Sequence, residues 1–279
     1  MSAVAARGEA RKGRLSAGNQ TVPGTQSIGR ASLILREVAS AGQNGMRLSE
    51  LVAGTGIQHA TAHRIVKSLV VENWLERDNV TKRYILGPLV FELGLCMPVR
   101  ADFRRIVQPV LAKLARDCNE TVYLNVRSGL DFVCVVREKG GLPIKPMVHD
   151  VGGRRPLGIG AGGIALLMEV EEKEAEQTIR KNSPRFRHYG QFTYDAALHT
   201  LRGSRSLGFV LLRDLDVAGL SAVSLPIHNV SRQPFAAITI VMDTARFSDE
   251  RSRGIVQMLR GAIQTIERRL TEPQRWAWL

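Results

Sequence analysis

A row of polar and basic side chains recurs at helical spacing between residues 58 and 67. His59, His63 and Lys67 are four residues apart, so on a helix they form one stripe opposite the apolar residues of the same segment. Amide, imidazole and ammonium groups on such a stripe can read base edges in a DNA major groove or bind phosphates. The alternative is an ordinary solvated helix face. The residues of this segment that we expect to contact DNA are Gln58, His59, Thr61, His63, Arg64 and Lys67.

Metal binding and catalysis have little support in the same residues. Histidines at i and i+4 can share a metal ion, but residue 60 is Ala60, so the H-E-x-x-H pattern is missing and no third ligand lies nearby. No G-x-S-x-G run occurs, and the remaining histidines are scattered along the chain. We therefore expect no metal site, no catalytic residues and no enzyme. The scattered histidines are His149, His188, His199 and His228.

A glycine-rich run at residues 158–163 spells G-x-G-x-x-G, the pattern of dinucleotide-binding turns. Such a turn needs a preceding β-strand and an acidic residue about twenty positions further on. Residues 152–156 do not have the pattern of a strand, so we expect no nucleotide cofactor. Two interpretations remain open. The run is either a helix start whose backbone N–H groups hold a carboxylate, or a place of close backbone packing alone.

The polar stripe lies within a succession of elements typical of a winged helix-turn-helix. Apolar residues recur every three to four positions in three segments, and two short strand-like segments follow. Three helices and a hairpin over residues 27–88 predict this DNA-binding domain, in which Lys82 and Arg83 of the wing contact phosphates or the minor groove. The predicted elements are helices at 27–42, 48–52 and 57–70 and strands at 74–77 and 83–86.

The chain beyond residue 88 predicts a linker and a second domain. Residues 89–101 predict a linker helix, with a short helix at 89–95 and a boundary at Pro98, and apolar spacing indicates a further helix at 103–118. Strands interleaved with helices over 102–272 predict an α+β domain. The glycine run leads into a helix from about Gly163, whose later part at 169–176 is acidic. A last helix follows Ser248, which can cap it. The predicted strands are 121–126, 132–137, 209–212, 220–227 and 235–242.

The overall composition points to an intracellular protein with a polyanionic partner. The 279 residues include 39 Lys and Arg against 26 Asp and Glu, a net charge of +13. A hydrophobic content of 44% is enough for real cores, while 5% aromatic residues argue against a single-strand binder that relies on base stacking. The three cysteines are widely spaced, and no signal peptide or membrane span is apparent. We expect a cytoplasmic location and no membrane contact.

The two ends of the chain lack the apolar periodicity of the rest. Residues 1–26 carry four basic residues and one acidic residue and predict a flexible basic arm. Residues 273–279 form a tail, in which Trp276 and Trp278 could pack against a domain or a second subunit.

Residues from about 27 to 270 resemble the IclR (isocitrate lyase regulator) family of bacterial transcription factors. The stretches that carry the resemblance are SIGRASLILREVAS, LSELVAGTGIQHATAHRIVKSLVVENWLERD, KRYILGPLVFELG and VGGRRPLGIGAGGIALL. The T-x-H-R run from Thr61 and the R-Y-x-L-G run from Arg83 lie at the family's spacing. The resemblance implies an N-terminal winged helix bound to a double-stranded DNA operator, a linker helix, and a C-terminal GAF-like domain that binds a small organic effector. It also implies a homodimer or homotetramer.

The chain departs from the family at positions that matter for binding of the operator and of the effector. Gln58-His59-Ala60 stands where many relatives have Pro-Lys-Ser, so the operator contacts should differ. In relatives that bind glyoxylate-like acids, the pocket has an acidic residue, a cysteine and two hydroxyl residues, and three of the four matching positions here are apolar. We therefore expect a larger, less polar carboxylate, aromatic or of medium size, with its acid group near Gly160 and Ala161. The expected effector contacts are Leu157, Gly160, Ala161, Leu212, Leu220, Ala222, Thr239 and Val241.

Two alternatives to an effector-controlled regulator remain open. One is an enzyme with a fused helix-turn-helix, which would need a catalytic constellation in residues 100–270. The other is a ligand-free regulator whose C-terminal domain only oligomerises.

Overall fold

The computed structural model describes residues 24–96, 98–142, 150–214, 217–229 and 231–271, which form two compact units that divide between Glu92 and Leu93. Most of the expected arm and all of the expected tail lie outside the described residues. The arm ends earlier than expected, because Gln26 already begins the first helix.

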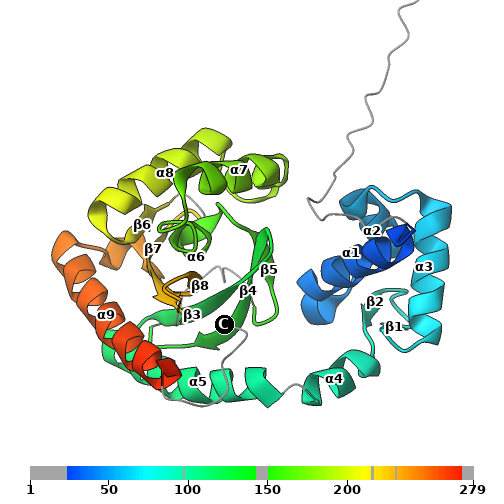
Figure 1. Cartoon of the computed structure of the whole chain (residues 1–279), viewed down its shortest axis with the longest axis horizontal. Coiled ribbons are helices and arrows are strands. Elements are labelled where there is room, and N and C mark those ends of the chain that lie inside the picture. The colour runs from blue at the N-terminus through cyan, green and yellow to red at the C-terminus, as the bar shows by residue number, and fades with distance from the viewer. Residues whose placement is uncertain (1–23, 97, 143–149, 215–216, 230, 272–279) are drawn as a thin grey trace, which may run out of the picture. The chain divides into compact units, whose positions relative to one another are not determined.

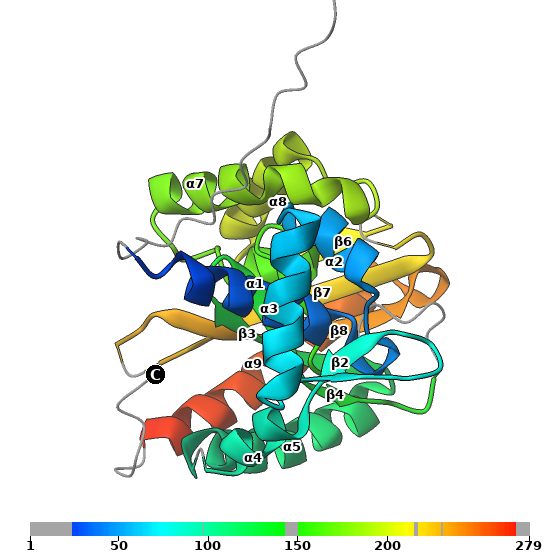
Figure 2. The same ribbon diagram turned by 90° about the vertical axis from the view of Figure 1, so that its right-hand side faces the viewer.

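The first unit is a three-helix bundle with a small antiparallel hairpin (Figure 2). Its core forms where the apolar faces of the three helices meet, with Ile34, Leu51 and Val66 fully or almost fully buried, and Tyr84 of the hairpin closes one side. This order of elements confirms the predicted winged helix-turn-helix. The elements are α1 (Gln26–Ser40), a short 3-10 helix (Gly42–Asn44), α2 (Leu48–Thr55), α3 (His59–Val71), β1 (Leu75–Arg77) and β2 (Tyr84–Leu86).

Local hydrogen bonds set both ends of α2 and thereby the direction of α3. At its start, the backbone N–H of Arg47 donates to the carboxylate of Glu50 at 2.8 Å. At its end, Gly56 adopts a left-handed conformation with φ +68° and donates to the carbonyl of Val52. A residue with a β-carbon would be strained there, so glycine allows the chain to turn sharply into α3.

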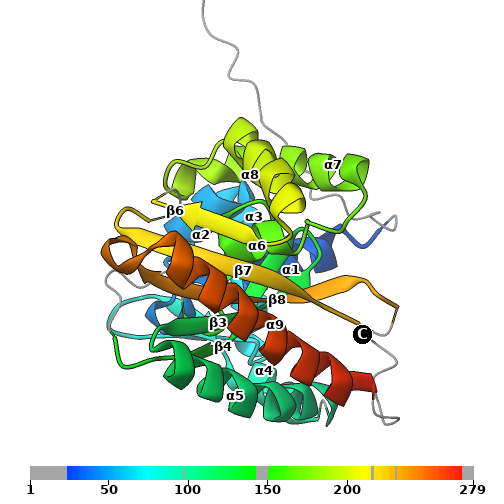
Figure 3. The same cartoon turned by 90° about the vertical axis from the view of Figure 1, so that its left-hand side faces the viewer.

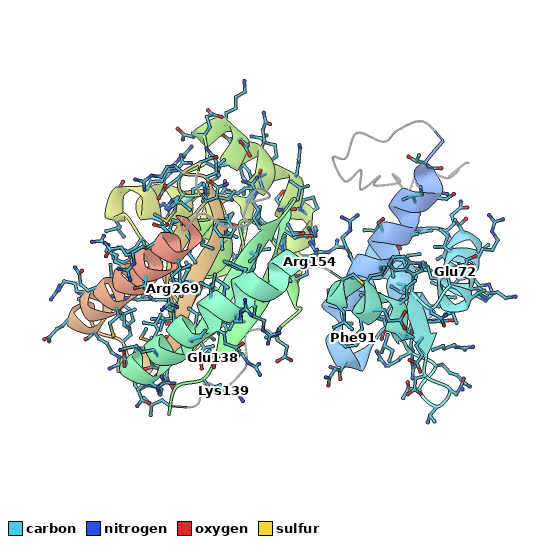
Figure 4. The ribbon with its side chains drawn as sticks, turned by 60° about the horizontal axis from the view of Figure 1, so that its bottom comes forward. Glu72, Phe91, Glu138, Lys139, Arg154 and Arg269 are labelled. Atoms are coloured by element: carbon cyan, nitrogen blue, oxygen red, sulfur yellow. The ribbon has the colours of Figure 1, made fainter. Side chains whose placement is uncertain are left out.

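The linker region at 89–101 contains parts of two helices. The short helix predicted at 89–95 is α4 (Pro88–Leu95), and the helix predicted at 103–118 is α5 (Pro98–Cys118), which begins five residues earlier than expected. Helix α4 buries none of its side chains and gives no clear apolar stripe. Phe91 of α4, labelled in Figure 4, is 67% exposed.

The second unit is built on a six-stranded sheet in the order β5-β4-β3-β8-β7-β6, in which every pair of neighbours is antiparallel (Figure 1). An antiparallel sheet combined with helices confirms the predicted α+β class. The strands are β3 (Thr121–Ser128), β4 (Asp131–Glu138), β5 (Arg154–Pro156), β6 (Val210–Arg213), β7 (Leu220–His228) and β8 (Pro234–Asp243). The helices of this unit after α5 are α6 (Gly160–Ala165), α7 (Glu172–Asn182), α8 (Tyr194–Leu207) and α9 (Asp249–Thr271), with 3-10 turns at Ser183–His188 and Thr244–Arg246.

Strand alternation gives the sheet two different faces. Along β8, Ile238 and Ile240 join the core beneath α5 and α9, while Thr239 and Val241 point to the opposite face. Figure 3 shows α9 crossing one face of the sheet with α5 beside it. The opposite face carries α6, and a second core there includes residues of α7 and α8. The sheet is therefore enclosed on both sides.

The structure corrects two predictions around the glycine run. Residues 154–156 do form a strand, β5, which is short and lies at the sheet edge against β4. It is antiparallel to its neighbour, so it lacks the parallel β-α-β arrangement of a dinucleotide-binding fold. The single helix expected from Gly163 is two helices, because α6 begins at Gly160 and ends at Ala165, and α7 begins at Glu172. Helix α8 was not predicted at all.

The last helix, α9, begins as the sequence indicates. The hydroxyl of Ser248 accepts a hydrogen bond from the backbone N–H of Arg251 at 3.1 Å, which confirms the predicted cap. Across the described part of the chain, no helix combines the length and apolar character needed to cross a membrane.

Candidate functional site

Helix α3 presents one polar face and buries the other. Ala62 and Val66 are buried in the core of the first unit, and Leu69 is nearly so. Figure 2 looks onto α3, which runs along the near side of its unit. Of the six α3-region residues expected to contact DNA, Thr61 is half-buried and five are exposed: Gln58, His59, His63, Arg64 and Lys67.

The two basic residues of the wing have different surroundings. Lys82 is exposed and has φ +58°, in the loop between β1 and β2. The guanidinium of Arg83 instead donates to the carbonyl of Gly45 at 2.8 Å and to both carboxylate oxygens of Glu50 at 3.2 Å. Arg83 thus connects the wing to the start of α2, and Lys82 is the residue displayed to solvent.

The wing loop is shaped by a second carboxylate. Asp78 accepts hydrogen bonds from the backbone N–H groups of Thr81 at 2.7 Å and Val80 at 2.8 Å. These bonds hold the pKa of the Asp78 carboxyl below its ordinary value, because they favour the charged form. Arg77, which the sequence did not single out, is exposed on β1 beside the ring of Tyr84 and adds a cation to this side of the unit.

The second unit contains a cavity of about 30 Å³ between α6 and the sheet, a volume that admits about two water molecules. The structure brings seven of the eight expected effector residues together in its lining. Leu157 does not line it and is fully buried in the core beneath α6. The seven are Gly160, Ala161, Leu212, Leu220, Ala222, Thr239 and Val241. The lining also includes six residues that were not among the expected contacts: Tyr123, Asn125, Phe132, Arg155, Gly162 and Val217.

Strand pairing explains how residues far apart in the sequence come to share this lining. Leu212 of β6, Ala222 of β7 and Val241 of β8 are direct neighbours across three strands, so they form one apolar row on one face. Tyr123 of β3 and Thr239 of β8 are paired in the adjoining row. The lining of the cavity is therefore decided by sheet register.

The glycine run allows α6 to lie directly on this face of the sheet. A β-carbon at Gly162 would fall 2.5 Å from the side-chain nitrogen of Asn125, and one at Gly163 would fall 2.8 Å from the ring of Phe132. Larger residues at either position would push α6 away from the sheet. This geometry supports the interpretation of close backbone packing, and it also brings Gly160, Ala161 and Gly162 to the cavity wall.

The polar groups of the lining are few and buried. Asn125 and Thr239 are 1% and 5% exposed, and the amide of Asn125 donates to the hydroxyl of Thr239 at 3.4 Å. The hydroxyl of Ser224, the cross-strand partner of Thr239 on β7, lies 2.9 Å from that of Thr239. Arg155 is 8% exposed, and its guanidinium carbon lies 4.8 Å from the ring centre of Tyr189. Among the described residues of the lining, Arg155 alone carries a charge.

His228 lies between two glutamates. Its Nδ1 lies 2.9 Å from Glu267 of α9, and its Nε2 lies 2.8 Å from Glu169, which precedes α7. These contacts connect the end of β7 to both segments. Within the described ranges, no three His, Cys, Asp or Glu residues are grouped so that they could hold a metal ion. His59 and His63 lie on the exposed face of α3.

Two family models match this chain. One is described as "Bacterial transcriptional regulator IclR C-terminal" and covers residues 98–268, and the other, "IclR helix-turn-helix domain", covers residues 27–79. The chain is 29% identical over 226 residues to the HTH-type transcriptional regulator KipR of Bacillus subtilis, covering 81% of this chain and 90% of KipR. It is 25% identical over 249 residues to the acetate operon repressor of Salmonella typhimurium, covering 87% and 89% of the two chains.

Solved structures share the fold. An IclR transcriptional regulator from Alicyclobacillus acidocaldarius matches with a TM-score of 0.69 at 20% identity, covering 90% of this chain and 99% of its own. An IclR homolog from Microbacterium hydrocarbonoxydans, complexed with 4-hydroxybenzoate, matches with a TM-score of 0.66 at 21% identity, covering 88% and 98%.

Proposed function

Because the chain belongs to the IclR family of bacterial transcriptional regulators, we propose that it binds an operator through α3 and that a small organic acid in the C-terminal unit controls this binding. The observation that supports the DNA contact is the polar face of α3, where His59, His63 and Lys67 are exposed in one stripe. The N-terminal part of such a helix enters the major groove in winged helix-turn-helix proteins, and wing residues contact the backbone.

The roles within this interface follow from side-chain chemistry and exposure. Lys67 and Arg64 supply long-range attraction to phosphates, because they are exposed cations. Gln58, His59 and His63 supply hydrogen bonds to base edges or phosphates. Lys82 contacts the backbone from the wing, whereas Arg83 positions the wing through Glu50.

The cavity in the second unit is the proposed effector site. Its lining combines an apolar row with one cation and three neutral polar side chains, which suits a carboxylate with a small apolar body. The IclR homolog with 4-hydroxybenzoate supports an organic acid as the ligand class. A cavity of about 30 Å³ is too small for an aromatic acid unless the walls move apart. A short aliphatic acid requires less movement.

Effector binding would act on DNA binding through a population shift in a dimer. A ligand that binds one conformation of the protein better than another changes the relative placement of two winged helices, and hence their fit to two half-sites. The ligand changes affinity only to the extent that it discriminates between the two conformations.

A direct test selects bound duplexes from a random DNA library with the full chain and then measures their affinity with and without candidate acids. We expect enrichment of an inverted repeat, loss of the enrichment in His59→Ala/His63→Ala, and a changed affinity for the selected duplex with at least one acid. Failure to enrich any sequence would contradict operator binding.

The small cavity also favours a second candidate, a regulator that binds DNA without any effector. Its second unit would serve only for oligomerisation. Calorimetry with short aliphatic and aromatic acids separates the two candidates, because a ligand-free regulator shows no binding heat with any of them while its affinity for the selected duplex is normal.

A further inference from the structure

A groove of about 340 Å³ lies at the surface between α5 and α9. The two helices pack side by side on one face of the sheet, as Figure 3 shows. The groove is large enough to hold an aromatic side chain, since binding sites for small molecules begin at about 300 Å³. Its wall is mostly apolar and includes Pro109, Val110, Leu114, Met258 and Ala262.

Gly261 leaves part of this groove open. It lies in the middle of α9 and is exposed, and a β-carbon built there would meet no neighbouring atom within 4 Å. Glycine inside a helix is less favourable than alanine, and no close contact requires it at this position. The groove therefore has room for a side chain that comes from another segment.

The charged groups of the lining already have partners. Lys113 pairs with Asp117 one turn along α5, and the guanidinium of Arg269 donates to the carbonyl of Ile106 at 3.4 Å. The groove thus does not call for a charged occupant. The hydroxyl of Thr265 donates to a carbonyl of its own helix at 2.9 Å, so its oxygen can accept a further hydrogen bond. An apolar ring with one N–H donor, the indole of tryptophan, matches this lining.

The chain leaves α9 beside one end of the groove. Arg269, two residues before the helix ends at Thr271, belongs to the lining, and Met258 lies at the other end. The stretch of α9 between these two residues is about 16 Å long, at about 1.5 Å per residue. Residues 272–279 span up to about 26 Å when extended. This length is enough for a turn and for a return along the whole groove.

The sequence of residues 272–279, EPQRWAWL, suits such a return. Pro273 disfavours continuation of α9, because proline lacks a backbone N–H and clashes with the preceding helical turn. Trp276 and Trp278 are two residues apart, so in an extended segment both indole rings lie on the same side. Burial of two large aromatic rings is a strong driving force for docking.

We propose that residues 272–279 dock in the groove of their own chain, with Trp276 and Trp278 packed between α5 and α9. The thioether of Met258 makes a favourable contact with an aromatic ring, and the hydroxyl of Thr265 accepts the indole N–H. A second copy of the chain is a poorer occupant. A stable dimer buries about 800 Å² per partner, and a groove for one or two side chains is a small part of that area. The docked segment covers an apolar surface that other chains could otherwise contact.

Fluorescence of the two rings tests this proposal in the full chain. Trp74→Phe removes the third tryptophan, so that the emission reports on Trp276 and Trp278 alone. We expect acrylamide to quench this emission at least about threefold less than that of free N-acetyltryptophanamide, because docked rings lose most of their contact with water. Gly261→Leu in the same background fills the groove and should raise the quenching close to that of the free compound. The matched control is Gly254→Leu, at another exposed glycine of α9 with open space around it, and it should leave the protection unchanged.

Two results would overturn the docking. The rings of the Trp74→Phe chain could be quenched like the free compound, or Gly261→Leu, shown by circular dichroism to be folded, could keep the protection.

Subunit mixing distinguishes the chain's own groove from that of another copy. Trp74→Phe/Gly261→Leu is refolded from urea together with an excess of Trp74→Phe/Trp276→Ala/Trp278→Ala, which has an open groove and no tail tryptophan. Docking within one chain leaves the rings as strongly quenched as before mixing. Restored protection would mean that the segment docks on another copy, and the assignment to its own chain would be wrong.

Discussion

The guanidinium of Arg83 and the carboxylate of Glu50 meet in two parallel hydrogen bonds, Nη1 to Oε2 and Nη2 to Oε1, each at 3.2 Å. The pair connects the wing to α2, and Arg83 also donates to the carbonyl of Gly45. Lys82, one residue earlier, is exposed. The sequence predicts the same DNA contact for Lys82 and Arg83. In the structure, their side chains have different surroundings.

Substitution of Arg83 should change the stability of the first unit, whereas substitution of Lys82 should change its affinity for DNA. Arg83→Ala should lower the thermal midpoint of the first unit by a few degrees, because it removes a partly exposed ion pair and the bond to Gly45. Lys82→Ala should leave the midpoint unchanged and weaken binding to duplex DNA. Differential scanning calorimetry and fluorescence anisotropy measure the two quantities. An unchanged midpoint in Arg83→Ala would show that its contacts do not stabilise the wing.

The stability around Glu50 should depend on pH in the acidic range. The hydrogen bond from the backbone N–H of Arg47, together with the charge of Arg83, holds the pKa of Glu50 below its ordinary value of 4.5. A pKa that is lower in the folded than in the unfolded protein adds stability at pH values above the unfolded pKa. This added stability is lost as the pH falls through the lower pKa of the folded protein. Hydrogen exchange of residues 45–55 between pH 3 and 6, corrected for intrinsic rates, should show increased opening on acidification. Glu50→Gln should show a weaker dependence.

Lys67 should contribute to DNA binding through one phosphate contact. Lys67→Ala should weaken binding to all duplexes about equally and reduce the slope of log affinity against log salt by about one. Lys181→Ala, an exposed lysine on α7 of the other unit, is the matched control. A salt slope that is the same in Lys67→Ala and in the control would contradict the assignment.

A buried carboxylate that pairs with two partly exposed arginines should stabilise the second unit more than an exposed pair does. Glu120 has no exposed surface and accepts from Arg246 at 3.0 Å and from Arg251 at 2.8 Å. Glu120→Gln should lower the free energy of unfolding by about 3 kcal/mol, because two arginines lose their shared counter-charge. Asp249→Asn removes the exposed pair with Arg213 and should cost less than about 1 kcal/mol. Urea unfolding measures both, and similar losses would be inconsistent with the burial argument.

The three cysteines should differ sharply in reactivity. Cys96 is exposed, whereas Cys118 and Cys134 are buried. Burial raises the pKa of both buried thiols, that of Cys134 to about 12, so they stay protonated and poorly nucleophilic at pH 8. A chromogenic disulfide reagent should titrate one thiol in the native protein and three in urea. Fast reaction of a second thiol in the native protein would mean that one buried cysteine becomes accessible.

Prediction from sequence succeeded where the pattern is local and long enough to read. Helix α3 follows from apolar residues at helical spacing, and β3 and β8 from runs of β-branched residues. It failed at β5, which has three residues and no alternation to detect, and at α6, which consists mostly of glycine and alanine. Strand β5 is held by its pairing with β4, and α6 is held by its close packing against the sheet.

The residues of the cavity illustrate a second limit. Seven of the eight expected contacts come together in its lining, but Arg155 was not expected, because nothing in the sequence distinguishes it from Arg154. Only the pairing of β5 with β4 decides which of the two arginines faces the cavity.

The sequence by itself determined the class of protein, the order of the elements in the first unit and the polar face of α3, since each depends on the spacing of residues within one segment. Tertiary structure alone decided the different surroundings of Lys82 and Arg83 and the choice of Arg155 over Arg154 for the cavity lining. The physical reason is the same in both cases. The task of a charged side chain depends on the partner it meets, and Glu50 and Phe132 are brought to these arginines by chain folding over more than twenty residues.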